Sequence, residues 1–211
     1  EILKGILVEI EQKKERGVIG TPLGHDKGLG EDLQRADDPS EQLEEEHWGH
    51  HGQRNVPEAP PAGRAMIAST TQLNTFGRDL GQTPGVHALT DVTGFALLGH
   101  ALEMARGAGL TAEITASPPL LPGIEDLARN GVRTGASTRN WDSYGESVTL
   151  SPAFDDWRRD ILCDPQTSGG LLIAADPASA DDIVAKARAA GFSDTNIVGR
   201  LAAGPPSILV R

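Results

Sequence analysis

Short apolar runs alternate with amphipathic segments from residue 64 to the end of the chain, and this alternation constrains the fold more than any other feature of the sequence. Short apolar runs bounded by glycine or proline are typical of buried strands, whereas apolar residues at three- and four-residue spacing are typical of helices. Strands that alternate with helices predict a layered sheet with helices packed on it. We therefore expect residues 64–211 to form one α/β domain around a mixed sheet.

The same patterns predict the positions of the elements. Strands are expected at 86–89, 110–115, 171–175, 197–201 and 208–210, and helices at 66–80, 94–106, 124–130, 154–162 and 180–190. A glycine after the last periodic residue favours a helix end, as at Gly109, Gly131 and Gly191. Ser179 stands just ahead of a periodic run and is expected to cap the helix 180–190.

The first 63 residues differ in composition from the rest. They hold fourteen acidic and seven basic side chains, so their net charge is −7 and the remaining residues carry −4. Residues 2–16 have one apolar stripe and are expected to form a helix. Residues 25–63 are rich in Glu, Asp, Gly and Pro, a composition that rarely offsets the entropy cost of ordering the backbone. We expect a poorly ordered N-terminal arm over 1–63.

Charge and cysteine content limit the classes of partner. The net charge of −11 argues against nonspecific binding to nucleic acid or to an anionic membrane. No apolar run is as long as a membrane span or a secretory signal. The single cysteine, Cys163, excludes an internal disulfide, so a cytoplasmic location is expected. Its neighbour Asp164 is expected to raise the thiol pKa, which would make Cys163 an inert packing residue.

Asp91 lies in the segment 90–100, TDVTGFALLGH, where a carboxylate precedes an amphipathic helix. Such a carboxylate is often a simple N-cap. Here Thr93 is available as the cap, and Gly94 allows a ligand to approach the backbone closely. Asp91 can therefore instead hold Mg²⁺ while the helix amides face phosphate oxygens. Both interpretations stay open on the residues alone.

Two further segments place polar residues among glycines. The segment 164–170, DPQTSGG, can be a tight turn before a buried strand, but a turn does not explain its run of Gln, Thr and Ser. The segment 134–140, TGASTRN, is read as a loop that ends in Arg139 and Asn140. This pair is suited to binding an anion or fixing a loop, although surface packing is its commonest use.

The histidines are interpreted mainly as packing or surface residues. His100 lies on an apolar helix face, where a histidine is usually a hydrogen-bonded core residue. His47, His50 and His51 stand beside a run of glutamates, and we expect only adventitious metal binding there because a metal site needs a rigid surrounding shell.

Taken together, TDVTGFALLGH and DPQTSGG resemble the C-terminal domain of selenophosphate synthetase (selenide, water dikinase), within the wider aminoimidazole ribonucleotide synthetase-like superfamily. The segment 134–140 resembles the family's PGGTxRN loop, with Thr134, Ala136 and Ser137 in place of proline, glycine and threonine. The resemblance covers 66–211 and implies that domain's fold. The family has glycine at Ala96, and we expect this change to be tolerated on a helix.

The resemblance also implies a function. It implies ATP-dependent phosphoryl transfer to selenide that gives selenophosphate, with ATP and Mg²⁺ as cofactors. It implies that Asp91 helps to bind the metal ions that hold the ATP phosphates. The other candidate ligand-binding residues lie in the same three motifs: Thr90, Thr93, Gly94, Arg139, Asn140, Thr167, Ser168 and Gly169.

The family's reactive cysteine or selenocysteine, its lysine and several aspartates belong to an N-terminal domain, and residues 1–63 contain no such motif. We therefore expect no catalytic residue in this chain and no selenophosphate synthesis by the chain alone. A second copy or a separate N-terminal domain are the partners considered. The alternative function is a noncatalytic relic that acts as a binding or regulatory module, and the coding sequence upstream would separate the two.

Overall fold

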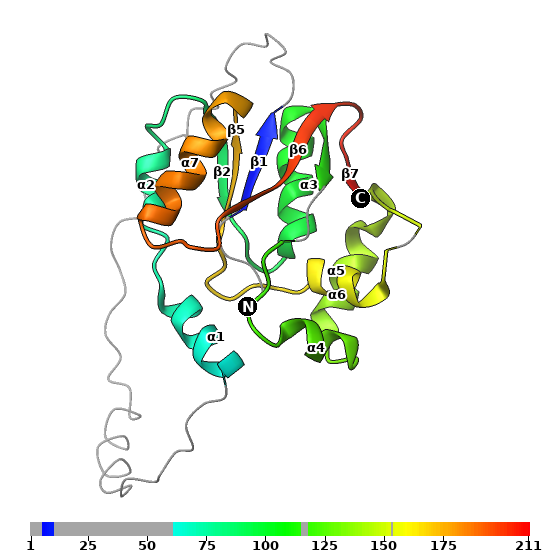
Figure 1. Ribbon diagram of the computed structural model, residues 1–211. Coiled ribbons are helices and arrows are strands. Elements are labelled where there is room, and N and C mark those ends of the chain that lie inside the picture. Colours follow the sequence, from blue (N-terminus) through cyan, green and yellow to red (C-terminus); the bar gives the residue numbers. More distant parts are fainter. Residues whose placement is uncertain (1–5, 11–60, 115–117, 153) are drawn as a thin grey trace, which may run out of the picture. The chain divides into compact units, whose positions relative to one another are not determined.

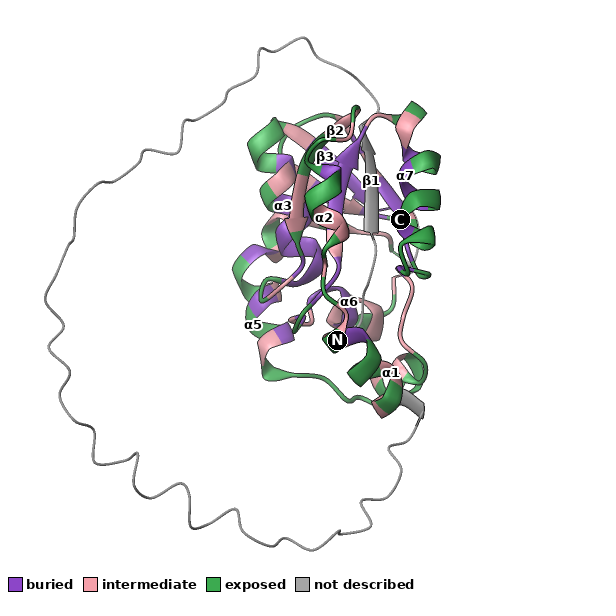
Figure 2. Ribbon diagram, turned by 90° about the vertical axis from the view of Figure 1, so that its left-hand side faces the viewer, coloured by how far each residue is buried: buried purple, intermediate pink, exposed green. Residues whose placement is uncertain are grey.

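The computed structural model describes residues 6–10, 61–114, 118–152 and 154–211, which form a mixed sheet with helices on both faces (Figures 1 and 2). The strands are β1 (Ile6–Ile10), β2 (Val86–Asp91), β3 (Leu110–Ile114), β4 (Val148–Leu150), β5 (Leu171–Ala175), β6 (Asn196–Ala203) and β7 (Ser207–Val210). The helices are α1 (Pro61–Thr71), α2 (Phe76–Leu80), α3 (Ala96–Ala108), α4 (Ile124–Arg129), α5 (Gly135–Tyr144), α6 (Asp156–Leu162) and α7 (Pro177–Ala189). This architecture confirms the predicted α/β class.

The strand order in this part of the chain is β2-β5-β1-β6-β3-β7-β4. β1 lies between β5 and β6 and is parallel to both. β2 runs antiparallel to β5, and β3 antiparallel to β6. The parallel pairs β3–β7 and β7–β4 complete the other side of the sheet.

Alternate residues of β5 belong to different layers. Leu172 and Ala174 lie in the core cluster with α3, whereas Ile173 lies in the cluster with Leu80 of α2 and Ile183 of α7. Figure 2 shows α3 and α7 on opposite sides of the sheet. Because both faces are covered, β5 has the continuous apolar sequence that is typical of a doubly buried strand.

The predicted helix over 2–16 is wrong where the structure describes it, because Ile6–Ile10 is the strand β1. A short aliphatic run such as ILVEI fits the hydrophobic period of a helix as well as that of a strand. Here the segment pairs with a strand on each side, so it forms part of the sheet. The rest of 2–16, the segment 25–63 and the three histidines at 47, 50 and 51 lie outside the described residues. The division of the chain at residue 63 stays a prediction.

Three further predictions need correction. The single helix predicted over 66–80 is two helices, α1 and α2, separated by residues 72–75. The predicted loop 134–140 is instead the start of α5, whose N-cap Thr134 accepts a hydrogen bond from the Ser137 amide at 3.2 Å. Ser179 does not cap α7, because the helix begins two residues earlier at Pro177, and proline favours the first helical position.

Other boundaries agree with the sequence patterns. Gly109 ends α3 with a φ of +67°, and Gly131 follows α4 with a φ of +83°. Both angles lie in the left-handed region that favours glycine. None of the described helices is long and apolar enough to cross a membrane.

Candidate functional site

The two main motifs lie side by side at one end of the sheet. Asp91 is the last residue of β2 and pairs with Leu171, the first residue of β5. Beyond this pair the Val92 amide donates to the Gly170 carbonyl at 2.9 Å. The backbone N–H of Gln166 likewise donates to the carbonyl of Thr93 at 3.0 Å. Backbone pairing therefore continues from the strands into both loops and fixes their relative position.

Gly169 is required by this close packing. A Cβ at this position would lie 2.0 Å from the Val92 carbonyl oxygen, so no other residue fits without movement of the backbone. The Gly169 carbonyl accepts a hydrogen bond from the Asn74 side chain at 2.7 Å. The next residue towards the N-terminus, Ser168, has a φ of +52°. The loop 164–170 therefore has a conformation that only a few residue types can adopt.

Asn140 ties both loops to α5. Its buried amide nitrogen donates to the Gly94 carbonyl at 2.8 Å and to the Cys163 carbonyl at 3.0 Å. These carbonyls lie just before α3 and just after α6. The sequence singled out Asn140 as a ligand-binding candidate, whereas its amide hydrogens are used to hold the two segments together.

The Asp164 carboxylate makes a second link to α5. Its Oδ1 accepts hydrogen bonds from the Thr134 hydroxyl at 2.8 Å and from the Ser137 hydroxyl at 2.7 Å. Two charge-assisted bonds of this kind are stronger than bonds between neutral groups. The segment that resembles the PGGTxRN loop therefore packs directly against the DPQTSGG loop.

The start of α3 differs from the prediction. The helix begins at Ala96, and Phe95 stands at the N-cap position without a side-chain capping bond. Thr93 does not cap the helix, because its hydroxyl lies 3.1 Å from Nε2 of His100. Asp91 cannot be the cap either, since it lies in β2. The N-cap interpretation of Asp91 is therefore excluded.

The candidate ligand-binding residues differ in exposure. The exposed ones are Asp91, Gly94, Arg139, Thr167 and Ser168, the partly exposed ones are Thr90 and Thr93, and the buried ones are Asn140 and Gly169. Within the part of the chain that the structure describes, the Asp91 carboxylate has no hydrogen-bond or ion-pair partner. An exposed and unpaired carboxylate beside two fixed loops is free to bind a cation.

A metal ion at Asp91 would have one carboxylate ligand from this position. Among the described residues there is no group of three or more His, Cys, Asp or Glu side chains that could hold a metal ion. A metal at Asp91 would therefore complete its coordination with water or with ligand oxygens.

The predictions for His100 and Cys163 are confirmed. His100 is buried and hydrogen-bonded, as expected of a core histidine. Cys163 is also buried, and burial raises the pKa of its thiol to about 11, with a smaller contribution from Asp160 and Asp164. The direction agrees with the sequence argument, but burial is the larger cause. The thiol is therefore protonated and unreactive near neutral pH.

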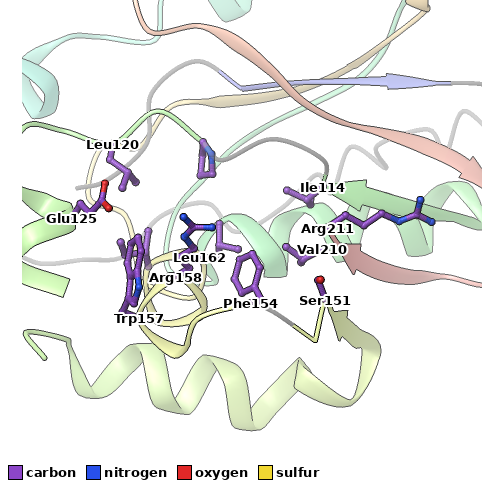
Figure 3. A pocket seen from close by; sticks show the side chains of 12 residues that line it. Ile114, Leu120, Glu125, Ser151, Phe154, Trp157, Arg158, Leu162, Val210 and Arg211 are labelled. Atoms are coloured by element: carbon purple, nitrogen blue, oxygen red, sulfur yellow. The ribbon is translucent and has the colours of Figure 1, made fainter. Parts of the chain in front are cut away.

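A cavity of about 290 Å³ is lined by residues outside the three motifs, and no sequence pattern predicted it (Figure 3). Phe154 and Trp157 form much of its wall. Its three charged residues have partners. Glu125 pairs with Arg129 at 2.7 Å, Arg158 with Asp155 at 3.8 Å and Arg211 with Glu113 at 3.5 Å. None of the motif residues lines this cavity, so the junction at Asp91 is the better candidate site.

Comparisons with known proteins agree with the motifs. Residues 41–210 match the family model "AIR synthase related protein, C-terminal domain". The chain is 49% identical over 148 residues to a selenide, water dikinase of Pseudomonas straminea. These residues are 70% of this chain and 42% of that protein. It is 51% identical over 152 residues to a selenide, water dikinase of Rhizobium meliloti (strain 1021), or 72% of this chain and 44% of that protein.

A third relative is the selenide, water dikinase of Burkholderia cenocepacia, 51% identical over 144 residues, which are 68% of this chain and 41% of that protein. The chain thus spans about two fifths of the length of the curated relatives that it matches. These matches confirm the resemblance that the three motifs indicated. The chain belongs to the family of AIR synthase related proteins and contains that family's C-terminal domain.

Proposed function

We propose that this domain takes part in the ATP-dependent formation of selenophosphate from selenide. Relatives of about 50% identity carry the name selenide, water dikinase, and the matching family model spans residues 41–210, which include all three motifs. The observation that carries the proposal is the Asp91 carboxylate, which is exposed, unpaired among the described residues, and held at the junction of two tightly packed loops.

The groups around Asp91 fit a magnesium–nucleotide complex. Mg²⁺ prefers oxygen ligands and is usually bound by one or two carboxylates together with substrate phosphates. When bound, the ion would neutralise charge on the phosphates. Asp91 would supply one carboxylate oxygen, and the exposed hydroxyls of Thr167 and Ser168 can donate hydrogen bonds to phosphate oxygens. Arg139 is exposed on α5 and makes no hydrogen bond or ion pair with the two loops among the described residues, so it stays a candidate for anion binding.

The proposed partners of the domain are ATP, selenide and either a further domain or a second copy of the chain. The proposed location of the protein is the cytoplasm. The free, buried thiol of Cys163 is consistent with a reducing compartment.

Asp91→Asn tests the proposal. The substitution removes the charge but keeps the shape, so we expect Mg²⁺-dependent ATP binding, measured by calorimetry, to weaken about tenfold or more. The free energy of unfolding should change by less than about 0.5 kcal/mol, because the side chain is exposed and does not cap a helix. Asp181→Asn on α7 removes the same charge from another exposed position and serves as the control. Unchanged affinity in Asp91→Asn would overturn the metal-binding role.

A further inference from the structure

Three side chains behind the Asp91 junction form a line of polar contacts. The Thr93 hydroxyl lies 3.1 Å from Nε2 of His100, and Nδ1 of the same ring lies 3.3 Å from a carboxylate oxygen of Glu103. His100 is only 7% exposed, whereas the Glu103 side chain is 60% exposed. A hydroxyl, an imidazole and a carboxylate thus follow one another from the site to the surface.

The Glu103 carboxylate lies next to Nδ1 of His100 and favours a proton on this nitrogen in the neutral ring. A carboxylate only accepts hydrogen bonds, so an unprotonated Nδ1 would direct its lone pair at a negatively charged oxygen. Nδ1 is buried and has no well-aligned hydrogen-bond partner among the described residues, although Glu103 lies within reach. A proton on Nδ1, attracted by Glu103, is therefore the favourable arrangement, and it leaves Nε2 as an acceptor.

This tautomer fixes the direction of the Thr93 hydroxyl. With Nδ1 protonated, the hydroxyl would donate its proton to Nε2, and its oxygen could then act only as an acceptor towards anything else. Thr93 is partly exposed and Asp91 is exposed, whereas Val92 between them is fully buried. The two accessible side chains of this segment thus both present acceptor oxygens, a combination that suits a cation or the water molecules around it.

We propose that His100 is a positioning residue that holds the Thr93 hydroxyl with its oxygen towards the cation bound at Asp91, and that Glu103 sets the tautomer. This inference rests on the proposed function. If His100 only filled space in the core, its hydrogen-bonding nitrogens would not affect cation binding, and any substitution would act through stability alone.

Two substitutions of His100 distinguish these roles. A glutamine side chain can place its amide group near the position of Nε2 and keep an acceptor for Thr93, whereas an asparagine amide lies near the position of Nδ1 and does not. Thr93→Ser and Thr93→Val form a matched pair, since only serine keeps the hydroxyl. The probe is Mn²⁺ with ATP, followed by paramagnetic broadening of the backbone amide signals of residues 90–94 in the 211-residue chain.

We expect His100→Gln and Thr93→Ser to bind Mn²⁺–ATP within about twofold of the unsubstituted chain. His100→Asn and Thr93→Val should bind about three- to tenfold more weakly, the effect of losing one hydrogen bond. Equal weakening in both His100 variants, in proportion to their loss of thermal stability, would show a packing role only. Absence of broadening in the unsubstituted chain would overturn both the proposed function and the role of Thr93.

The tautomer is measured separately by long-range ¹H–¹⁵N correlation of the imidazole rings, with His100→Gln identifying the signals of His100. We expect a protonated Nδ1 and a bare Nε2, and a larger share of the other tautomer in Glu103→Ala. A proton on Nε2 in the unsubstituted chain overturns this inference even if Asp91→Asn behaves as proposed. The two failures are therefore distinguishable.

Discussion

Ala96 has a backbone conformation that is unfavourable for a residue with a side chain. Its φ is +60°, in the left-handed region where Cβ approaches the backbone, at a cost of about 1–2 kcal/mol. The family resemblance indicated glycine at this position, and we expected alanine to be tolerated on a regular helix. The structure changes that expectation, because Ala96 lies at the first turn of α3, where the chain is not yet in the right-handed conformation.

Ala96→Gly is expected to stabilise the domain. Relief of the left-handed strain is opposed by loss of one buried methyl group, which is worth about 0.8 kcal/mol, so the net gain should reach about 1 kcal/mol at most. Ala101→Gly is the control, since Ala101 is buried in the interior of the same helix and should lose about 1 kcal/mol or more. Urea unfolding measures both variants. A loss of stability in Ala96→Gly as large as in the control would contradict the argument.

The Cys163 thiol gives a prediction that depends on pH. Because burial raises its pKa from 9.0 to about 11, the thiolate fraction at about pH 8 should be on the order of 100-fold lower than in the unfolded chain. Alkylation by iodoacetamide should therefore be at least that much slower in the folded protein than in concentrated urea. Cys163 is the single cysteine, so the measured rate belongs to one site.

The same shift affects stability with a definite sign. A folded-state pKa above the unfolded value means that the contribution of the protonated thiol is complete below about pH 9 and is lost as the pH rises through about 11. Cys163→Ala should reduce the fall in stability over this range. Native labelling as fast as labelling in urea would show that the thiol is accessible and not perturbed.

Elements were predictable from the sequence where local signals agreed with each other. The end of α3, the helix α4 and the strand β5 have a regular period together with glycine at a boundary. The site was less predictable, because its geometry comes from contacts between distant segments. No local pattern shows that Asn140 faces two backbone carbonyls, that Gly169 packs against the Val92 carbonyl, or that 135–140 is helical.

Asn140 is expected to matter more for stability than its exposed neighbour Arg139. Asn140→Ala removes two hydrogen bonds and leaves the carbonyls of Gly94 and Cys163 without this donor, which should cost about 2–3 kcal/mol. Asn140→Asp keeps the side-chain volume but replaces the donor by a carboxylate, so it should also lower the stability of the domain. This result would exclude a cavity as the cause of the loss in Asn140→Ala. Arg139→Ala should stay within about 0.5 kcal/mol.

Urea unfolding of these three variants decides the point. An Asn140→Ala free energy of unfolding that equals that of Arg139→Ala would mean that α5 does not hold the two loops. In that case Asn140 would again be a candidate for direct contact with a ligand, as the sequence first indicated.

For the whole molecule, the alternation of strands and helices predicted the class but not the order of the strands. β6 and β7 are joined by the short turn at residues 204–206, yet β3 lies between them in the sheet. The hydroxyl of Thr111 in β3 donates to the Pro205 carbonyl in that turn at 2.7 Å. Such pairing is decided by which apolar faces meet after the chain has collapsed, and no local pattern encodes it.

The central position of β1 leads to the last prediction. Without residues 6–10, the facing edges of β5 and β6 would lose their partner strand, and unpaired edges in the middle of a sheet favour aggregation. A chain of residues 61–211 should therefore unfold at a lower temperature than the whole chain, and a peptide of residues 1–13 added in trans should raise its melting temperature. A peptide with Val8→Pro should not, because proline removes an amide from a strand that is paired on both sides. Equal melting temperatures for residues 61–211 and the whole chain would show that β1 is dispensable, and would support an autonomous domain that begins near residue 63.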